Sequence, residues 1–432
     1  MNLIKPVSRQ SSMSSASTVA PTLAKRFEEP TAPSEEEKSR KRGERLFSLD
    51  FLRGLDIFVL TVVGVVLFAA DGLYKLPPEV MKQFLHPEWV GFSLYDMIMP
   101  LFIFMCGAAL PLALPRYLES DGSASLTYWT RVLKRVAMLW ILGMIVQGEL
   151  FSFDLHRISF FNNTLQTIAV GYLFTAVVAR IPSRAVQIVI PFALAGGYTA
   201  FLHFCGDMTP TGNAAVVYEV KFLELFYPHA SWHPVSQILD MHYTWWTTIP
   251  MFGAMGLAGY HATTILLHET WDQKRKASVM MITGLALVGL GFALTTFDPC
   301  VKHIFTASFT SIAMGVSFVL YSICYTIFDI RRLRFGAGPI MLFGRNSLVA
   351  YLLVESCFKL ALMSVPAVVL PGVKLVADGG GGYVFEGADR FGLLPVVLQC
   401  VALVFALYVW DWYKRGKSAA AKAAKEAAKE TK

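Results

Sequence analysis

The stretch FLRGLDIFVLTVVGVVLFAA, residues 51–70, is typical of a membrane-spanning helix. Its last fourteen residues carry no charged side chain, and a helix of about twenty residues covers the roughly 30 Å of a membrane's hydrocarbon core. Because lipid offers no hydrogen-bond partners, each such run must satisfy its backbone groups internally, and a helix does so. Similar runs recur at residues 92–114, 136–152, 164–180, 185–203, 245–266, 277–296, 304–328, 338–360 and 392–412. The sequence therefore predicts an all-α polytopic membrane bundle of ten transmembrane helices, or eleven if the apolar segment 361–376 re-enters the membrane.

The composition excludes a soluble protein. The chain has 432 residues, of which 55% are hydrophobic and only 16% charged, and its mean hydropathy is +0.50. Soluble domains carry about 25% charged residues. The net charge of +7 comes from short loops and tails, so it does not indicate a nucleic-acid partner. The six cysteines form no CxxC pair, and no metal site is expected.

The distribution of Lys and Arg predicts the orientation. The loops taken as cytoplasmic hold 12 of these residues in 45 positions, and the loops on the other side hold 7 in 111 positions. Cytoplasmic loops are the ones enriched in Lys and Arg, so both termini are predicted to be cytoplasmic. The predicted organisation is a disordered tail at 1–45, a transmembrane domain at 46–413 and a basic tail at 414–432. A bacterial inner membrane is the expected location, because no targeting signal is present.

Charged and amide side chains inside spans are costly and point to function or to ion pairs. Arg53 and Asp56 lie one turn apart, and Glu355 and Lys359 lie at i, i+4. The simplest interpretation of each pair is a structural ion pair.

The most informative stretch is HPEWVGFSLYDMIMPLFIFMCG, residues 86–107. His86 lies at the non-cytoplasmic mouth of a predicted span, and Trp89 suits a membrane interface. Asp96 follows ten residues after His86, so a turn that folds back would let its carboxylate orient the imidazole. Histidine serves proton transfer near neutral pH and is also a nucleophile. Spacing alone leaves a histidine that only hydrogen-bonds a loop as the alternative.

Four stretches together resemble a known family. They are SLDFLRGLD at 48–56, the block at 86–107, NTLQTIAVGYL at 163–173 and FGRNSL at 343–348. In this order the chain resembles the transmembrane acetyltransferases typified by heparan-alpha-glucosaminide N-acetyltransferase, together with their bacterial relatives. The resemblance extends over residues 46–412. It departs at Gly64, where the family's lysosomal member has a functional asparagine.

The resemblance implies an enzyme that moves an acetyl group from cytoplasmic acetyl-CoA to an acceptor on the other side, an amino sugar or a cell-envelope glycan. It implies that His86 is catalytic, with Asp96 beside it. Acetyl-CoA carries phosphates, which arginine can bind in a bidentate manner. The residues expected to bind acetyl-CoA are Arg135, Gln166, Arg345 and Asn346. The residues expected to bind the acceptor are Trp89, Asn163 and Trp232.

Several alternatives stay open at this point. His86 acts either as a general base in a ternary complex or as a nucleophile that carries the acetyl group. A secondary transporter for a sugar would also place polar groups within the membrane. The expected partners are the lipid bilayer and the acceptor, and a homodimer with a second copy of the chain is left open.

Overall fold

The computed structural model describes residues 46–118, 125–146, 150, 161–226, 244–356, 358–377 and 383–430. The chain divides into two units, residues 1–44 and 45–432. The predicted tail at 1–45 lies outside the described residues, and everything below concerns the second unit.

The described residues are almost entirely helical, and the all-α prediction is confirmed. The helices are α2 (Phe47–Phe58), α3 (Gly64–Tyr74), α4 (Pro78–Met81), α5 (Ile98–Ala108), α6 (Leu110–Ala113), α7 (Leu126–Val146), α8 (Thr164–Val178), α9 (Arg184–Cys205), α10 (Ala214–Phe226), α12 (Ile249–Leu266), α13 (Gln273–Leu294), α14 (Ala307–Cys324), α15 (Gly338–Arg345), α16 (Ser347–Glu355), α17 (Phe358–Val369) and α18 (Leu394–Glu430). The short elements between them are the π-helices η2 (Val59–Val63) and η8 (Tyr325–Ile330) and the 3₁₀ turns η3 (Leu94–Met97), η4 (Pro115–Tyr117), η7 (Trp246–Thr248) and η9 (Asp389–Phe391). The strands β1 (Lys374–Ala377) and β2 (Tyr383–Glu386) pair as an antiparallel hairpin. Each of the ten predicted spans overlaps a helix.

The protein is a multi-pass membrane protein. By length and composition, six of the described helical segments can cross a membrane: Phe47–Tyr74, Leu94–Ala113, Arg184–Cys205, Gln273–Leu294, Ala307–Ile330 and Leu394–Ala420. Three of these helices, α9, α13 and α18, expose large apolar side chains, among them Phe192, Ile282 and Phe405. Lipid is the solvent that such a surface requires, because a soluble monomer rarely exposes apolar patches of this extent. Membrane crossing by α7, α8 and α12 stays a prediction.

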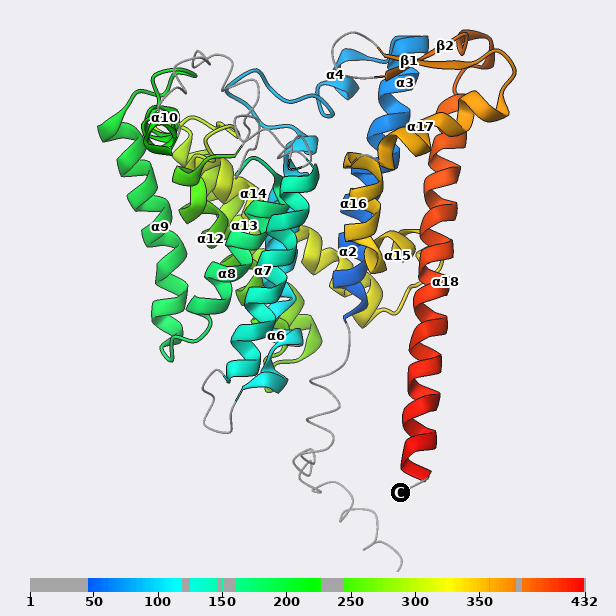
Figure 1. The fold of residues 1–432 in the computed structure, drawn as a ribbon. Helices are drawn as coiled ribbons and strands as arrows, with labels where there is room; N and C mark the ends of the chain where they lie inside the picture. Colours follow the sequence, from blue (N-terminus) through cyan, green and yellow to red (C-terminus); the bar gives the residue numbers. More distant parts are fainter. Residues whose placement is uncertain are drawn as a thin grey trace, which may run out of the picture. The chain divides into compact units, whose positions relative to one another are not determined.

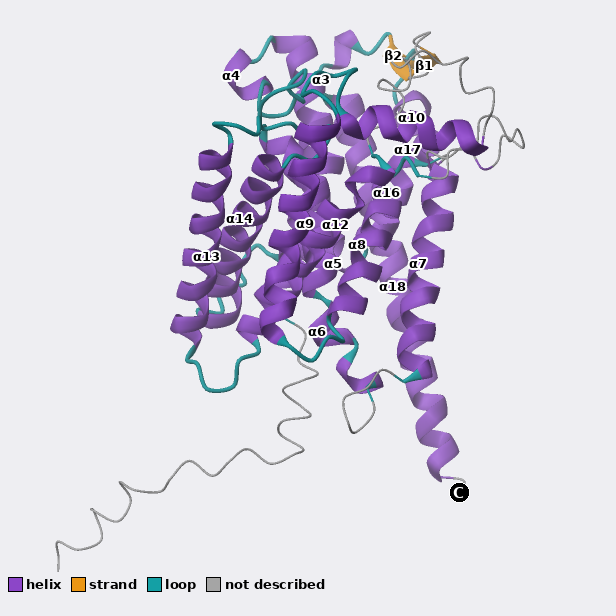
Figure 2. Cartoon of the chain, turned by 90° about the vertical axis from the view of Figure 1, so that its left-hand side faces the viewer, coloured by secondary structure: helices purple, strands orange, loops and turns teal. Residues whose placement is uncertain are grey.

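The helices form two neighbouring groups that are joined through α2 (Figure 1). One group has α5, α8, α12 and α14 at its centre, with α9 and α13 on its outside (Figure 2). The other consists of α2, α3 and α15–α18. We call the end of the bundle that carries α4, α10 and the hairpin the upper end, and the end that carries α6 the lower end, as drawn in Figure 1.

Glycines allow these helices to touch through their backbones. A Cβ atom added to Gly54 of α2 would lie 2.1 Å from the carbonyl oxygen of Ile340, and one added to Gly344 of α15 would lie 1.9 Å from that of Asp50. Contacts of this kind are typical of membrane helices, where small residues allow close approach. The glycines in the stretches at 48–56 and 343–348 therefore have a packing role, since they lock α2 against α15.

Two expectations about the spans and two about ion pairs need correction. The third span begins at Leu126, ten residues before the predicted start. Arg131 and Arg135 lie over the rings of Tyr117 and Tyr172, with the guanidinium carbons 4.1 and 4.4 Å from the ring centroids. These cationic residues therefore extend the helix, because their side chains stack on aromatic faces.

The predicted span 338–360 is two helices, because the helical run breaks at Asn346 and ends at Glu355. Glu355 and Lys359 therefore do not share a helix, and their carboxylate and amine form no ion pair within 4 Å among the described contacts. Arg53 is paired with Asp50, with the Nη1 and Oδ1 atoms 3.3 Å apart, and the expected pair with Asp56 is wrong.

The segment 361–376 covers most of α17 and of β1, and α16 and α17, bent by 70° from each other, together are long and apolar enough for a broken span or a re-entrant loop. In Figures 1 and 2, α17 lies crosswise at the upper end and not along the spans. Helix α18 continues from the last predicted span into the segment 414–430 without a break.

Candidate functional site

The loop after α4 folds back onto the start of η3 and brings His86 against Asp96. The distance from His86 Nδ1 to Asp96 Oδ1 is 2.6 Å. The other carboxylate oxygen, Oδ2, accepts the backbone N–H of Ser93 at 2.9 Å. The Asp96 side chain is fully buried, whereas 46% of the His86 side chain is exposed. This buried carboxylate fixes the orientation and the tautomer of the imidazole, because it accepts the Nδ1 proton and leaves Nε2 without one.

Lys302 completes the cluster from a distant part of the chain. Its ammonium lies 3.1 Å from Asp96 Oδ1. It also lies 3.0 Å from His86 Nδ1 and 3.2 Å from Nε2. Because it is nearly equidistant from both ring nitrogens, it rests against the face of the imidazole and not in line with either lone pair. Burial lowers the pKa of Lys302, although the neighbouring Asp96 carboxylate acts in the opposite direction.

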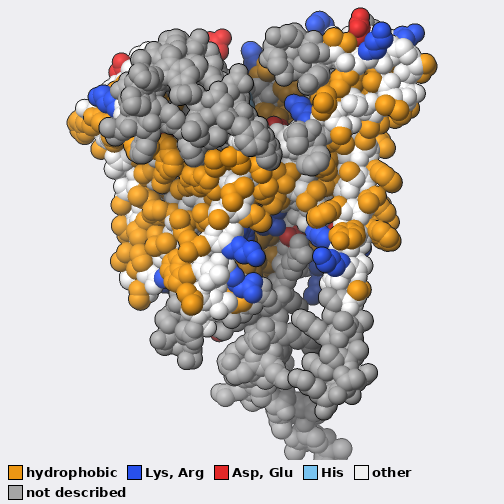
Figure 3. Space-filling model, viewed as in Figure 1, with side chains coloured by type: hydrophobic (Ala, Val, Ile, Leu, Met, Phe, Trp, Pro, Cys, Tyr) orange, Lys and Arg blue, Asp and Glu red, His pale blue; other side chains and the backbone are white. Residues whose placement is uncertain are grey.

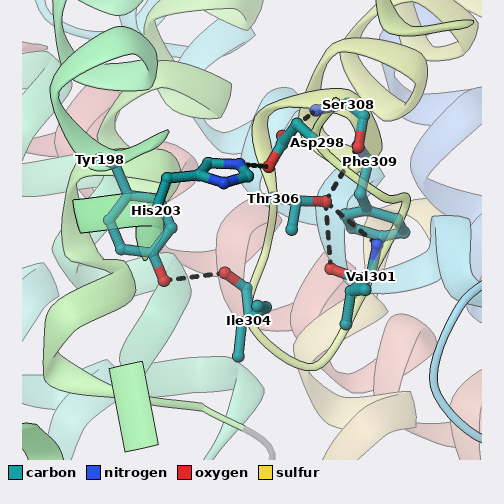
Figure 4. A network of polar contacts seen from close by, with 8 residues as sticks. All are labelled: Tyr198, His203, Asp298, Val301, Ile304, Thr306, Ser308 and Phe309. Atoms are coloured by element: carbon teal, nitrogen blue, oxygen red, sulfur yellow. Dashed lines mark hydrogen bonds and ion pairs between the residues drawn. The ribbon is translucent and has the colours of Figure 1, made fainter. Parts of the chain in front are cut away.

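Figure 4 shows how the loop that carries Lys302 is held between α13 and α14. Asp298 accepts the backbone N–H of Ser308 at 3.1 Å and pairs with His203 Nε2 of α9 at 3.3 Å. The hydroxyl of Tyr198, also on α9, donates to the carbonyl of Ile304 at 2.8 Å. Burial raises the pKa of Asp298. Helix α9 thus anchors the loop on both sides of Lys302.

A pocket of about 290 Å³ opens beside this cluster. Its lining residues come from both groups of helices: Leu60, His86, Tyr95, Ile98, Met99, Phe102, Thr164, Lys302, His303, Tyr351 and Glu355. Phe102 lies six residues beyond Asp96, so the pocket reaches about 9 Å down α5. In Figure 3, charged side chains gather at two heights along the furrow between the two groups of helices. The volume is near the lower limit for small-molecule sites, and the apolar walls with a few polar groups are typical of them.

A second imidazole faces this pocket. The ring of His303 stacks on Trp89 at a centroid distance of 5.6 Å, and its backbone carbonyl accepts the indole N–H of Trp245 at 2.7 Å. Burial, and then the charges of Lys302 and His86, lower the pKa of His303. A neutral imidazole therefore faces the pocket at neutral pH, and its Nδ1 atom has no hydrogen-bond partner in the described part of the chain.

The departure at Gly64 has a structural counterpart. A Cβ atom at Gly64 would lie 3.3 Å from the Tyr95 hydroxyl, so the phenol occupies the space that a larger side chain would need. The π-helix η2 directly precedes Gly64, and such turns are frequent at functional sites. The ring of Tyr95 lies 5.5 Å from that of His86. Tyr95 thus supplies a polar group at this wall of the pocket.

Two of the residues expected to contact the acceptor make structural contacts instead, and the third lies outside the described residues. Trp89 donates from Nε1 to the carbonyl of Met208 at 2.8 Å and supports His303. Asn163 caps α8 by accepting the N–H of Leu165 at 2.7 Å. The next residue, Thr164, does line the pocket. Trp232 lies outside the described residues.

The residues expected to bind acetyl-CoA lie away from the pocket lining. Gln166 is buried, and its Oε1 atom accepts the N–H of Asn162 at 2.8 Å. Arg135 Nη2 donates to Cys106 Sγ at 3.6 Å and its guanidinium stacks on Tyr172. Both side chains therefore contribute to packing among α5, α7 and α8.

Arg345 and Asn346 belong to a cluster between α15 and α18. The cluster is built on the buried Asp411, which Arg415 also contacts. Arg345 Nη2 lies 3.4 Å from Asp411 Oδ2. Asn346 donates to Asp411 at 3.4 Å and accepts from Lys414 at 2.9 Å. Two arginines contact the carboxylate and Lys414 contacts the adjoining amide, so the cluster holds three cations and one carboxylate and is suited to an anion.

Sequence reasoning missed Lys302 and His303. They are consecutive in the seven-residue loop 297–303, between two long apolar runs. A lysine, a histidine and an aspartate in so short a loop beside the membrane would have indicated candidate site residues. Only the fold shows that this loop faces His86, which precedes Lys302 by 216 residues.

Comparison with known families supports no activity. A family model described as a domain of unknown function (DUF5009) matches residues 45–208. The matched region contains His86 and Asp96 and ends before Lys302. No curated protein matches the chain. The chemistry of this site therefore has to be argued from its geometry.

Proposed function

We propose that this protein is a membrane-embedded acetyltransferase that uses acetyl-CoA and an amino sugar or glycan acceptor. The observation that carries the proposal is the cluster of His86, Asp96 and Lys302 at the mouth of a small pocket. A carboxylate-oriented imidazole next to a cation combines a base with a stabiliser of negative charge, which acyl transfer requires. The resemblance in the four sequence stretches points to the same reaction.

In this proposal His86 acts as general base. Its Nε2 atom takes a proton from the acceptor amine or hydroxyl as the acceptor's lone pair attacks the thioester carbonyl carbon. The carbonyl π electrons move to the oxygen, and the Lys302 ammonium stabilises the resulting charge. When the carbonyl re-forms, the C–S bond breaks, and the thiolate leaves with the electron pair and takes the proton from His86. Asp96 holds the imidazole in position and stabilises its protonated form.

The cluster around Asp411 is the proposed site for the phosphates of the donor. Helix α16 begins directly after Asn346 of this cluster and ends at Glu355, which lines the pocket. Its nine residues rise about 13 Å. An extended pantetheine arm along α16 would span much of this distance and bring the thioester toward His86. The arm would run from the lower end toward the upper end, as a transfer across the membrane requires.

Sealed vesicles of known orientation test this proposal. Labelled acetyl-CoA is supplied on the cytoplasmic face and a membrane-impermeant hexosamine on the opposite face, and labelled product is measured. We expect product only with this arrangement. Product formed when both substrates are restricted to one face would contradict the transfer across the membrane.

The same vesicles distinguish the enzyme from a transporter. A secondary transporter would move labelled hexosamine across the bilayer without acetylating it. Uptake of unmodified sugar by the wild-type protein, with no acetylated product, would refute the proposed reaction.

A further inference from the structure

Glu355 is the one carboxyl group among the pocket-lining residues that the structure describes. It is the last residue of α16, and it enters the pocket from the helix group opposite Lys302. A carboxylate is unfavourable at a helix C-terminus, because the helix dipole places partial negative charge there. Helix stability therefore does not explain a glutamate at this position.

The Glu355 carboxyl group also makes no structural contact that would explain its position. Among the described contacts it makes no hydrogen bond and no ion pair within 4 Å, although the charge of Lys359 acts on it from the exposed side. Half-buried carboxylates are normally paired, because removing them from water without a partner is unfavourable. A ligand group with a positive charge or with N–H donors would supply this missing partner.

The uneven distribution of charge around the pocket supports a positively charged ligand group at Glu355. One side carries the Lys302 ammonium, which repels a cation, together with the imidazoles of His86 and His303. Its other side carries Glu355, and Tyr95 lies between the two sides, with its ring 5.5 Å from that of His86 and its hydroxyl within the electrostatic influence of Glu355. A sphere of the pocket's volume is about 8 Å across, so a group held at Glu355 lies within reach of the facing His86.

Resting on the proposed function, we infer that Glu355 is the specificity-determining residue for the acceptor: its carboxylate binds the acceptor's protonated amino group and thereby favours amines over hydroxyls. The hydroxyl of Tyr95, which lines the same pocket, accepts or donates a further hydrogen bond to the acceptor. The Glu355 carboxylate then takes one proton from this ammonium, which frees the lone pair for attack, and His86 across the pocket removes the second proton as the C–N bond forms.

Binding, measured without the donor, tests the inference. Glucosamine and glucose are the probes, because they differ only in an amino or hydroxyl group at one carbon. Purified protein in lipid nanodiscs is titrated with each sugar by calorimetry, at a pH where the amine is protonated. We expect the wild type to bind glucosamine more tightly than glucose, and Glu355→Gln to lose about tenfold or more of its affinity for glucosamine. Affinity for glucose should stay unchanged.

The control is Glu386→Gln, which removes an exposed carboxylate from β2 at the same end of the bundle. It should bind glucosamine as the wild type does. Glu355→Asp keeps the charge on a shorter side chain and should retain part of the preference. Size-exclusion profiles identical to wild type establish that each variant is folded.

The outcomes separate the inference from the proposed function. Equal losses for both sugars, no loss in Glu355→Gln, or no glucosamine binding by the wild type would each overturn the role of Glu355. Selective binding that is lost in Glu355→Gln, in a wild type that transfers no acetyl group, would uphold this role and refute the enzyme.

Discussion

Replacing Lys302 with methionine tests the cluster at the pocket mouth. The substitution removes the ammonium that lies 3.1 Å from the Asp96 carboxylate and keeps a side chain of similar length. Asp96 is fully buried, so it keeps its charge in low dielectric with only His86 and the Ser93 N–H as partners. Lys302→Met should therefore lower both stability and activity.

The geometry sets the size of the effect. Two unit charges 3.1 Å apart attract by about 5 kcal/mol at an effective dielectric constant of about 20. Desolvation of both groups opposes this attraction, and hydrogen bonds to charged groups contribute about 1.5–3 kcal/mol net. We expect Lys302→Met to reduce the free energy of unfolding by about 2–3 kcal/mol. Loss of a charge that stabilises an oxyanion should lower kcat by about 10²–10³-fold.

A double-mutant cycle with Asp96→Asn isolates the interaction. Unfolding of Lys302→Met, Asp96→Asn and the double variant is followed by denaturant titration in one detergent. A coupling free energy of about 2 kcal/mol is expected, because the two groups are in contact. Additive effects to within about 0.5 kcal/mol would refute the reasoning, since Lys302 would then not stabilise Asp96.

Further predictions concern pH, packing and topology. Burial raises the pKa of Glu219 from 4.5 to about 7, so its contribution to stability is present below 4.5 and is lost as pH rises through 7. The unfolding midpoint of the wild type should fall between pH 5 and 8 relative to that of Glu219→Gln, and parallel curves would contradict this. Gly344→Ala forces a Cβ to within 1.9 Å of a carbonyl oxygen of α2 and should destabilise the protein by about 1–3 kcal/mol, whereas Gly416→Ala, which has open space, should change thermal stability little. Cysteines introduced at Ser183 and Thr211, in a background without other exposed cysteines, should react with an impermeant reagent from opposite faces of the membrane; labelling from one face would disprove the topology.

The class of fold was predictable because lipid imposes it. A run such as 51–70 can satisfy its backbone in lipid only as a helix, so hydrophobicity and length suffice. The ends of the helices were less predictable. Stacking of Arg131 and Arg135 on tyrosines extends α7 into a segment whose charges indicated a loop, and the break at Asn346 divides a continuous apolar run.

Only the part of the candidate site whose residues are close in sequence was predictable. Ten residues separate His86 from Asp96, and one turn of chain brings them together, as the spacing indicated. Lys302 lies in the loop before α14 and Glu355 at the end of α16, and both line the same pocket. The periodicity of a single sequence does not predict that these two residues lie close together. Their proximity depends on how the helices pack through glycines such as Gly54. The pairing of Glu355 with Lys359 was expected from helical spacing and failed because the helix ends between them.

Acetyl transfer by the purified protein shows whether the protein is the proposed enzyme. Wild-type protein and His86→Ala in nanodiscs are incubated with labelled acetyl-CoA and a hexosamine, and the acetylated sugar is separated and counted. We expect labelled product from the wild type and a loss of at least about 10²-fold in His86→Ala. The variant should stay folded, because the His86 side chain is half exposed. Wild-type rates in His86→Ala, or no product from the wild type with any hexosamine, would contradict the account.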